Sequence, residues 1–511
     1  MIIDNNYSIS LSFFILGTSY LFWRYVQRQQ STAQKLQITY SKQTSWIWGH
    51  ELEIFQHEAS KMYIQWAESL GSVYRIKPGL FQPDIVVIGD NSAAHHILQN
   101  CYTYVKPPTL LHVVEKILGH GLAWAEGEDH KYQRRLLAPA FTSGAVEAMT
   151  DDIFSCVDRM TQTLRATLID SDEKNGEIVD MVPIMSACTL DIIGRVGFGH
   201  DFDGGKSADA KAISDAWHQD VVMSRTFAGL IAPILISAFP WITSLPLPAF
   251  RDSVARQVVQ KIAGKLISDN SNNTNVLRGR DILSILLNGT QNSKENLEAR
   301  LTTTELLDNT TAVTVDFILL RLAQNPSSQG KLRDEIRSVA ALDYNSISKL
   351  EYLNAVTKEG LRLHPASLPT ERVVQPILTE SGESVSSFAF KAGQVFRIPW
   401  TVLNVNKQVW GNNADEFIPE RWIEPGGVPP ADRLPHGPWS GVSSFSDGPR
   451  NCIGYRLGLV ELKIMVAALV RSFEFECTEA KIVQYIAPSL QPFADGKAAS
   501  MPLKVSLAPE M

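Results

Sequence analysis

The stretch FSDGPRNCIGYRLGLVELK at residues 445–463 decides the fold, because it places Cys452 in a glycine-bracketed loop that runs directly into an apolar-periodic segment. The periodicity predicts a helix that begins near Gly454. A cysteine outside a disulfide is most often a small buried hydrophobic residue. The alternative is a metal ligand, for which the thiolate must stay charged, and the positive end of a following helix stabilises such an anion.

The bulk composition describes a globular chain. Its 511 residues are 44% hydrophobic and 20% charged, which is enough to bury a large core. The net charge of −7 and the lack of a basic block argue against nucleic acid as a partner. The cysteines are scattered and form no CxxC pair, which argues against a disulfide scaffold or a structural zinc cluster and suits a reducing compartment. They are Cys101, Cys156, Cys188, Cys452 and Cys477.

The N-terminus is apolar. Residues 5–23 carry no charge and are just long enough to span a bilayer as a helix. Basic residues follow the run, namely Arg24, Arg28 and Lys35. By the positive-inside rule the chain after them is cytosolic. The sequence therefore predicts a transmembrane anchor at 1–30 and a catalytic domain at 31–511, with a buried N-terminal helix as the alternative.

A second uncharged run covers residues 226–250. Four prolines within it make one straight helix an unfavourable structure. The run predicts an apolar loop with short helical pieces that dips into a membrane surface or covers a lipophilic channel. A core loop is the alternative.

The remaining pattern predicts one mainly α domain with a smaller β-rich part. Strand-like pieces occur at 72–79 and 83–89, and the pattern is mostly helical from 92 to 341. After Pro365 the chain becomes irregular, with a strand-like piece at 388–400. No linker divides this part, so we expect the β-rich part to combine both ends of the chain.

Four stretches resemble the cytochrome P450 family and occur in the family's order. The pattern F-x-x-G-x-R-x-C-x-G around Cys452 resembles the haem-binding signature. Glu359 to Arg362 resembles the family's E-x-x-R motif, PERW at 419–422 its P-E-R-F/W block, and HKYQRRLLAPAF at 130–141 the early helix that reaches the haem edge. The resemblance implies a P450-like fold, with a single catalytic domain after an N-terminal membrane helix, as in microsomal members of fungal type.

The resemblance also implies roles for individual residues. Cys452 would be the axial ligand of the iron in haem b, a thiolate that favours O–O cleavage. The residues implied around the haem are Phe445, Gly448 and Gly454 in the loop and Arg450, His130, Arg134 and Arg372 at the propionates. For His130, where the family often has tryptophan, an ordinary polar surface role is the alternative. Glu359, Arg362 and Arg421 would form a structural network.

The distal helix departs from the family pattern. Thr310 and Thr311 occupy the threonine places, and with Asp308 they are the catalytic candidates for proton delivery. Leu306, Leu307 and Asn309 stand where the family has a small residue, glycine and an acid. Roughly three turns of helix are absent, through a real shortening or a mis-joined gene model. The departure bears on oxygen activation and not on haem binding.

The expected function is a haem-thiolate monooxygenase at the endoplasmic reticulum membrane, single-pass with a cytosolic catalytic domain. It would insert one oxygen atom from O2 into a lipophilic small molecule, such as a terpenoid or other secondary metabolite, using NADPH through a cytochrome P450 reductase. The reductase would dock on a basic patch formed by Arg450, Arg456, Lys463, Lys131 and Arg135. The alternatives are an O2-independent haem-thiolate isomerase or dehydratase and a haem-binding pseudo-enzyme.

Overall fold

The computed structural model describes most of the chain after residue 44. The described residues are 18–20, 45, 47–80, 82–170, 176–244, 252–272, 281–282, 310–367, 369–374, 390, 392–439 and 441–509. The predicted anchor lies outside them except for 18–20, and so does the departure at Leu306 to Asn309.

Helices make up most of the described chain. The α-helices are α3 (Glu51–Gln56), α4 (Lys61–Leu70), α5 (Asn91–Gln99), α6 (Pro108–Leu118), α7 (Gly127–Leu137), α8 (Ser143–Asp170), α9 (Met181–Phe198), α10 (Ala208–Ser224), α11 (Phe227–Ala238), α12 (Val254–Asn272), α15 (Thr310–Gln324), α16 (Pro326–Arg337), α17 (Tyr344–Lys349), α18 (Glu351–Leu363), α19 (Trp400–Val405), α20 (Lys407–Trp410) and α21 (Tyr455–Ser472). Short 3-10 helices are η1 (Ala138–Phe141), η2 (Pro240–Ser244), η5 (Pro419–Trp422) and η6 (Gly448–Arg450).

The strands form three small sheets. They are β1 (Val73–Ile76), β2 (Ile85–Ile88), β3 (Tyr104–Val105), β4 (Glu177–Asp180), β5 (Thr370–Val374), β6 (Val395–Ile398), β7 (Phe473–Cys477), β8 (Ile482–Ile486), β9 (Leu490–Ala494), β10 (Lys497–Ala498) and β11 (Pro502–Leu507). The largest sheet has the order β1-β2-β6-β5-β3, so strands from the start of the chain pair with strands from its last third. This confirms the expectation that both ends of the chain build the β-rich part.

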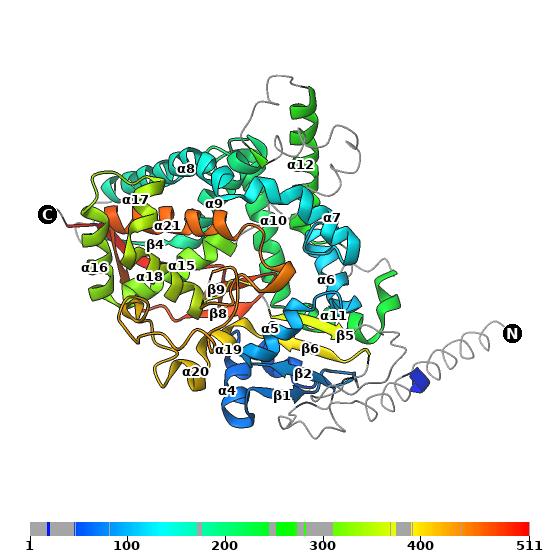
Figure 1. Cartoon of the computed structure of the whole chain (residues 1–511). Helices are drawn as coiled ribbons and strands as arrows, with labels where there is room; N and C mark the ends of the chain where they lie inside the picture. The colour runs from blue at the N-terminus through cyan, green and yellow to red at the C-terminus, as the bar shows by residue number, and fades with distance from the viewer. Residues whose placement is uncertain are drawn as a thin grey trace.

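Helix α15 runs through the middle of the helical part (Figure 1) and packs against α9, α18, α21 and β7. Its residues from Thr311 to Leu320 are all buried. A helix that is apolar on every side must be surrounded by other elements, which explains its central place. Helices α9 and α21 separate it from α8, which packs on both of them, and the five-stranded sheet lies away from it.

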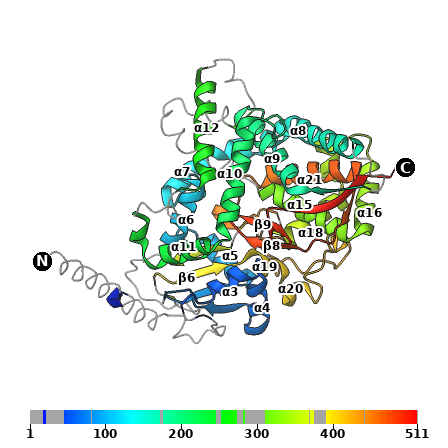
Figure 2. The same ribbon diagram turned by 180° about the vertical axis from the view of Figure 1, so that it is seen from behind.

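The apolar run after Arg225 forms a longer helix than we predicted. Helix α11 spans twelve residues with Pro233 inside it, and η2 follows. The Thr226 side chain accepts a hydrogen bond from the Gly229 amide and so caps the helix, while Leu230 and Ile234 are buried. Burial of the apolar face outweighs the cost of the internal proline here. Figure 2 shows α11 below α6, near the five-stranded sheet.

Among the described residues, one helix and one bent pair of helices are apolar and long enough to cross a membrane. One is α9, which is 61% buried within the molecule and is therefore a core helix. The other is the pair α10 and α11, whose axes are bent by 76°.

Candidate active site

The loop before α21 presents Cys452 at its end. The Cys452 amide donates to the carbonyl of Phe445 at 2.8 Å and closes the loop. Cys452 is exposed, whereas Cys101, Cys156 and Cys188 are buried. Helix α21 begins at Tyr455, three positions later, as the sequence predicted. Cys452 is therefore not a core cysteine, and it lies beside the positive end of an 18-residue helix.

The two glycines of the loop, Gly448 and Gly454, differ in whether a side chain would fit at their position. Gly448 adopts φ +69°, and a Cβ there would lie 2.4 Å from the Leu98 carbonyl oxygen of α5. Gly454 has φ −85°, and a Cβ there would only touch the Phe141 ring at 3.5 Å. The steric need for glycine at 448 thus comes from the close approach of α5, a reason that the sequence did not indicate.

Asp447 fastens the loop to α5. Its side chain accepts hydrogen bonds from the Gly448 amide at 2.6 Å and the Gln99 amide at 3.3 Å, and its other oxygen lies 2.6 Å from Nδ1 of His95. The sequence analysis missed these contacts. The available signal was an aspartate directly before the glycine of a short helix, which is a common capping arrangement.

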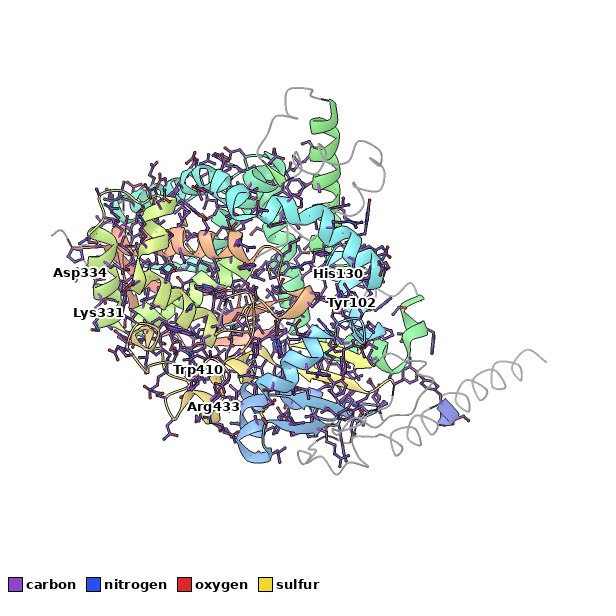
Figure 3. All side chains as sticks on the ribbon, in the orientation of Figure 1. Tyr102, His130, Lys331, Asp334, Trp410 and Arg433 are labelled. Atoms are coloured by element: carbon purple, nitrogen blue, oxygen red, sulfur yellow. The ribbon has the colours of Figure 1, made fainter. Side chains whose placement is uncertain are left out.

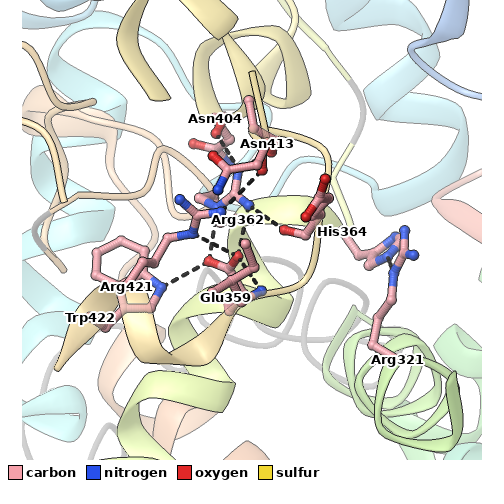
Figure 4. Close-up of polar contacts among 11 residues, drawn as sticks. Arg321, Glu359, Arg362, His364, Asn404, Asn413, Arg421 and Trp422 are labelled. Carbon is pink, nitrogen blue, oxygen red and sulfur yellow. Dashed lines mark hydrogen bonds and ion pairs between the residues drawn. The ribbon is translucent and has the colours of Figure 1, made fainter. Parts of the chain in front are cut away.

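Beneath the loop, Glu359 accepts hydrogen bonds from two arginines (Figure 4). Arg362 donates to both of its oxygens at 2.8 and 2.9 Å, and Nε of Arg421 donates to one at 3.0 Å. The Trp422 indole and the Ile418 amide complete the set at 2.9 and 3.0 Å. The predicted triad is therefore present, with two further donors that the motifs did not reveal.

The Arg362 guanidinium uses every donor that it has. It is fully buried, and besides Glu359 it donates to the backbone carbonyls of Asn404, Ala414 and Glu416. These bonds and the two to Glu359 match the five N–H groups of an arginine. The Trp410 ring lies 4.9 Å from the guanidinium carbon. Glu359 carries one negative charge for two arginines, and the backbone carbonyls and the Trp410 ring face further stabilise the positive charge of Arg362.

Asn404 connects this network to the cysteine loop. Its carbonyl accepts from Arg362, and its side-chain oxygen accepts from the Ser443 amide and hydroxyl, both at 2.9 Å. The Ser444 hydroxyl then donates to the Leu361 carbonyl at 2.6 Å. The residues just before Phe445 are held to α18 in this way.

Above the loop, basic side chains converge from four segments. His130 lies on α7, at the right of the molecule in Figure 3, and Arg372 lies on β5. Arg450 donates to the Ala125 carbonyl at 2.8 Å and pairs with Glu126. Lys106 reaches the same glutamate at 2.9 Å. The sequence analysis predicted three of these basic groups and missed Lys106 and Glu126.

The cluster contains buried nitrogens that have no hydrogen-bond partner within the described chain. They are Nδ1 of His130, Nε of Arg372 and Nε of Arg450. Burial, and then the neighbouring charge of Arg450, lowers the pKa of Arg372 to about 10. Burial and the surrounding cations lower the pKa of His130 to about 3, so its imidazole is neutral. A site with excess positive charge and unmatched buried donors fits a carboxylate-bearing group such as haem, which carries two propionates.

Arg134 is engaged with the protein itself. It donates to the carbonyl of Asn451 at 2.7 Å and also to the Asn451 side chain. Its charge interacts with Cys452. In the described structure Arg134 thus holds the residue next to the cysteine, and its predicted propionate contact stays a prediction.

The distal helix begins at Thr310, whose carbonyl accepts from the Thr314 hydroxyl at 2.9 Å. Thr311 is buried, and its hydroxyl lies 3.8 Å from an ideal Cβ on Gly458 of α21. Asp308 lies outside the described residues. Further along the helix Asp316 is fully buried, and neither of its carboxyl oxygens has a hydrogen-bond partner in the part of the chain that the structure describes. Burial raises its pKa well above the usual range, so it is held as a neutral acid.

His364 joins α15 to the hairpin of β8 and β9. Its ring stacks on Phe317 at 4.5 Å, and its Nε2 accepts from Nε of Arg321 at 2.9 Å (Figure 4). Its Nδ1 must therefore carry the proton, and it faces the Gln484 side chain at 3.4 Å. Burial, and then Arg321, lowers the pKa of His364 to about 3. His364, the residue after α18, is thus a neutral side chain that packs between α18, α15 and β8.

The predicted reductase patch needs a correction at Arg450. The side chain of Arg450 is only 4% exposed because Glu126 and the Ala125 carbonyl hold it inside the molecule. Lys463 is also largely covered: its ammonium lies 5.6 Å from the Trp439 ring, and burial lowers its pKa to about 8. Arg450 therefore belongs to the interior cluster and not to the surface patch.

We call the cluster of Lys106, His130, Arg372 and Arg450 the basic cradle. The fold is mainly helical, and it places the exposed Cys452 before a long helix, with the ion network of Glu359 on one side and the basic cradle on the other. These are the features of a haem-thiolate protein. The family model for cytochrome P450 matches residues 41–490. The chain is 29% identical to cytochrome P450 monooxygenase claP of Ampulloclitocybe clavipes, over 87% of this chain and 88% of that protein. It is 30% identical to cytochrome P450 monooxygenase 205 of Postia placenta, over 85% of this chain and 84% of that protein.

The chain belongs to the cytochrome P450 family. Membership makes it an oxidoreductase whose cofactor is haem iron, with NADPH through a reductase as the usual electron source of the family. The predicted mainly α fold and the identification of the family are confirmed.

Proposed function

We propose that the protein is a membrane-anchored monooxygenase that inserts one oxygen atom from O2 into a lipophilic small molecule. The observation that carries the proposal is the exposed Cys452 at the start of α21, held between a complete ion network and a basic cradle with unmatched donors. Relatives named as monooxygenases favour oxygen chemistry over an isomerase, a dehydratase or a pseudo-enzyme.

In this proposal each group has one task. The Cys452 thiolate would hold the haem iron, and the bound haem would supply the chemistry that activates O2. Arg372, Arg450 and His130 would bind the propionates, since each has one buried nitrogen without a hydrogen-bond partner among the described residues. Thr310, at the first turn of α15, orients water and passes protons through its Oγ1. Glu359, Arg362 and Arg421 hold the cysteine loop without touching the reacting atoms.

The membrane assignment rests on the apolar face around α11. The Tyr20 hydroxyl, in the described piece of the predicted anchor, donates to the Ala238 carbonyl at 2.7 Å. The Tyr20 ring lies 5.3 Å from that of Phe239. Phe227 and Trp241 nearby are 65% and 63% exposed. An anchor beside exposed aromatic residues supports a single-pass protein at the endoplasmic reticulum with its catalytic domain in the cytosol.

The substrate and the redox partner follow from the same features. A membrane-facing apolar surface suits a substrate that partitions into lipid, such as a terpenoid or another secondary metabolite. Lys131, Arg135 and Arg456 remain as the basic surface on which an NADPH–cytochrome P450 reductase would dock.

The test uses the full chain purified with haem and combined with a fungal reductase. We expect a red-shifted ferrous–CO band, and NADPH- and O2-dependent conversion of at least one member of a panel of terpenoids and fatty acids. The variant Cys452→Ser should lose the shifted band. An unshifted CO band in the wild-type protein would overturn the thiolate assignment, and conversion without O2 or NADPH would favour the isomerase alternative.

A further inference from the structure

Arg225 lies at the junction of α10 and α11, where two aromatic rings flank its guanidinium. The guanidinium carbon is 4.2 Å from the centre of the Phe55 ring, which comes from α3. It is also 4.2 Å from the centre of the Tyr485 ring, which comes from β8. Three segments far apart in the sequence therefore meet around a single half-buried cation.

No carboxylate among the described residues pairs with Arg225. Its Nη1 is buried and makes no hydrogen bond. Several interior arginines of the described chain are paired with a carboxylate, as Arg75 is with Asp84 at 3.1 Å and Arg397 with Glu371 at 2.6 Å, whereas Arg225 resembles Arg372 in having no such partner. Burial lowers the pKa of Arg225, which reflects how poorly its charge is solvated. A buried donor without an acceptor is uncommon in a folded protein and needs an explanation.

The position of the two rings limits which kind of group can accept a hydrogen bond from Arg225. The two rings lie close to the guanidinium carbon and supply no strong hydrogen-bond acceptor, so the N–H donors of Arg225 stay available to an acceptor from elsewhere. A carboxylate fits this arrangement because its two oxygens match two parallel N–H bonds.

The surroundings are apolar and contain a second unmatched donor. Trp217, Val221 and Arg225 follow one another at four-residue spacing, so they lie along one face of α10. Val221 packs with Ala487 and Phe493 of the hairpin. The indole Nε1 of Trp217 is buried and has no hydrogen-bond partner in the described chain. Arg225 therefore lies at the end of an apolar contact between α10 and the hairpin, with a second unmatched donor about two turns away on the same helix face.

The hairpin connects this face to the distal helix. Strand β9 packs against α15, and Gln484, the residue before Tyr485, faces His364, whose ring stacks on Phe317 of α15. Arg225 thus stands on the outer side of an element whose inner side contacts the helix that begins at Thr310. An acid held at Arg225 would keep its head at the outer end of the site.

We propose that Arg225 binds the carboxylate of a lipophilic acid, so that the substrate class is carboxylic acids with a long apolar body and not neutral hydrocarbons. This inference rests on the proposed function for the identity of the reaction, but the binding step does not depend on turnover. The alternative source of an oxyanion at this place is a phospholipid headgroup, which the test separates.

The experiment measures binding to the haem-loaded full chain by equilibrium dialysis and by the substrate-induced Soret shift. The probes are matched pairs, namely palmitic acid with methyl palmitate and abietic acid with methyl abietate. We expect at least one acid to bind about 10- to 100-fold more tightly than its ester, the range for a charge-assisted pair. Arg225→Gln should remove this preference while leaving ester affinity unchanged, and Arg225→Lys should keep part of it. Arg165→Gln, an exposed arginine on α8, is the matched control and should keep all of it.

Each outcome decides between the possibilities. Equal binding of acid and ester in the wild-type protein would overturn the proposal, and so would an equal loss of both in Arg225→Gln, which would mean a purely structural role. If Arg225→Gln instead weakens binding to vesicles containing phosphatidylserine but keeps the acid preference, the occupant is a lipid headgroup and the substrate assignment is wrong. Dialysis reports acid binding even where the CO band is unshifted, so failure of the haem-thiolate proposal and failure of this one are distinguishable.

Discussion

The ion network under the cysteine loop and the basic cradle above it both contain buried arginines, but they differ in how completely the donors of these arginines are matched by acceptors. In the network every donor of Arg362 has an acceptor within the protein, and Glu359 accepts five hydrogen bonds. In the cradle Arg372, Arg450 and His130 each keep a buried nitrogen with no partner in the described chain. The difference separates charges that complete the fold from charges that are arranged for a ligand.

The physical basis is the cost of an unmatched buried polar group. A fully paired network is stable without any ligand, and removing one member leaves the others stranded. A partly matched cluster has the reverse property, because its energy improves only when an acceptor arrives. Substitutions in the two regions should therefore affect different measurements.

Glu359→Gln should have the largest effect. It leaves the size of the side chain nearly unchanged but removes the negative charge that faces two buried guanidinium groups. We expect a loss of about 3–5 kcal/mol in the free energy of unfolding, measured by denaturant titration. The control is Glu128→Gln, whose side chain is 87% exposed and pairs with Lys131 on the surface. A stability loss no larger than the control's would remove the distinction between the two regions.

Arg372→Gln should weaken haem retention and leave folding mostly intact. Loss of one charge-assisted contact to a propionate corresponds to about 10- to 100-fold in affinity, which haem transfer to apomyoglobin measures. Arg372→Lys should recover part of it, because the charge remains. If haem retention is unchanged and only the unfolding energy falls, the cradle arginine is structural and resembles the network after all.

Asp316→Asn tests an unmatched group that no ligand is proposed to satisfy. The native pKa of Asp316 is raised well above its usual value by burial, whereas an unfolded aspartate titrates near pH ~3.9. Between these two values the native state holds a proton that the unfolded state has released, so wild-type stability falls as the pH rises, by about 1.4 kcal/mol per pH unit.

The asparagine variant lacks this proton linkage. Its stability relative to the wild type should therefore improve as the pH rises from the ordinary aspartate pKa toward the raised native pKa, as followed by thermal unfolding at a series of pH values. A difference that stays constant with pH would show that Asp316 is already ionised in the native protein.

The sequence predicted the network better than the cradle, for a reason of chain distance. Glu359 and Arg362 are one helical turn apart, so local spacing indicates that pair, and the resemblance of the PERW block to the family motif adds Arg421. Glu126 meets Arg450 across 324 positions, and no local pattern links them. Gly448 is similar, because the Leu98 carbonyl that forbids a side chain there comes from a distant helix. Local motifs thus gave the identity of the site, whereas its electrostatic balance depends on tertiary contacts.

The apolar run after Arg225 shows the same limit in the fold. Its four prolines argued for a loop, yet twelve residues form α11. Propensity is a local quantity, and packing of the apolar face overrode it. The position of Arg225 between two distant rings was equally invisible in the sequence, since Phe55 and Tyr485 lie 430 positions apart (485 − 55).

Lys331→Ala should cause the smallest loss in the free energy of unfolding, because it removes an exposed ion pair. Lys331 lies on the outer face of α16 (Figure 3) and pairs with Glu420 at 2.8 Å, with side chains 55% and 26% exposed. Glu420 belongs to the same PERW segment as Arg421, but it also accepts from the Tyr352 hydroxyl at 2.8 Å and stays solvated. We expect a loss of about 0.2–1 kcal/mol that salt reduces further, measured by denaturant titration at low and high ionic strength. A loss comparable to that of Glu359→Gln would mean that membership of the motif, and not burial with complete pairing, determines which charges hold this fold together.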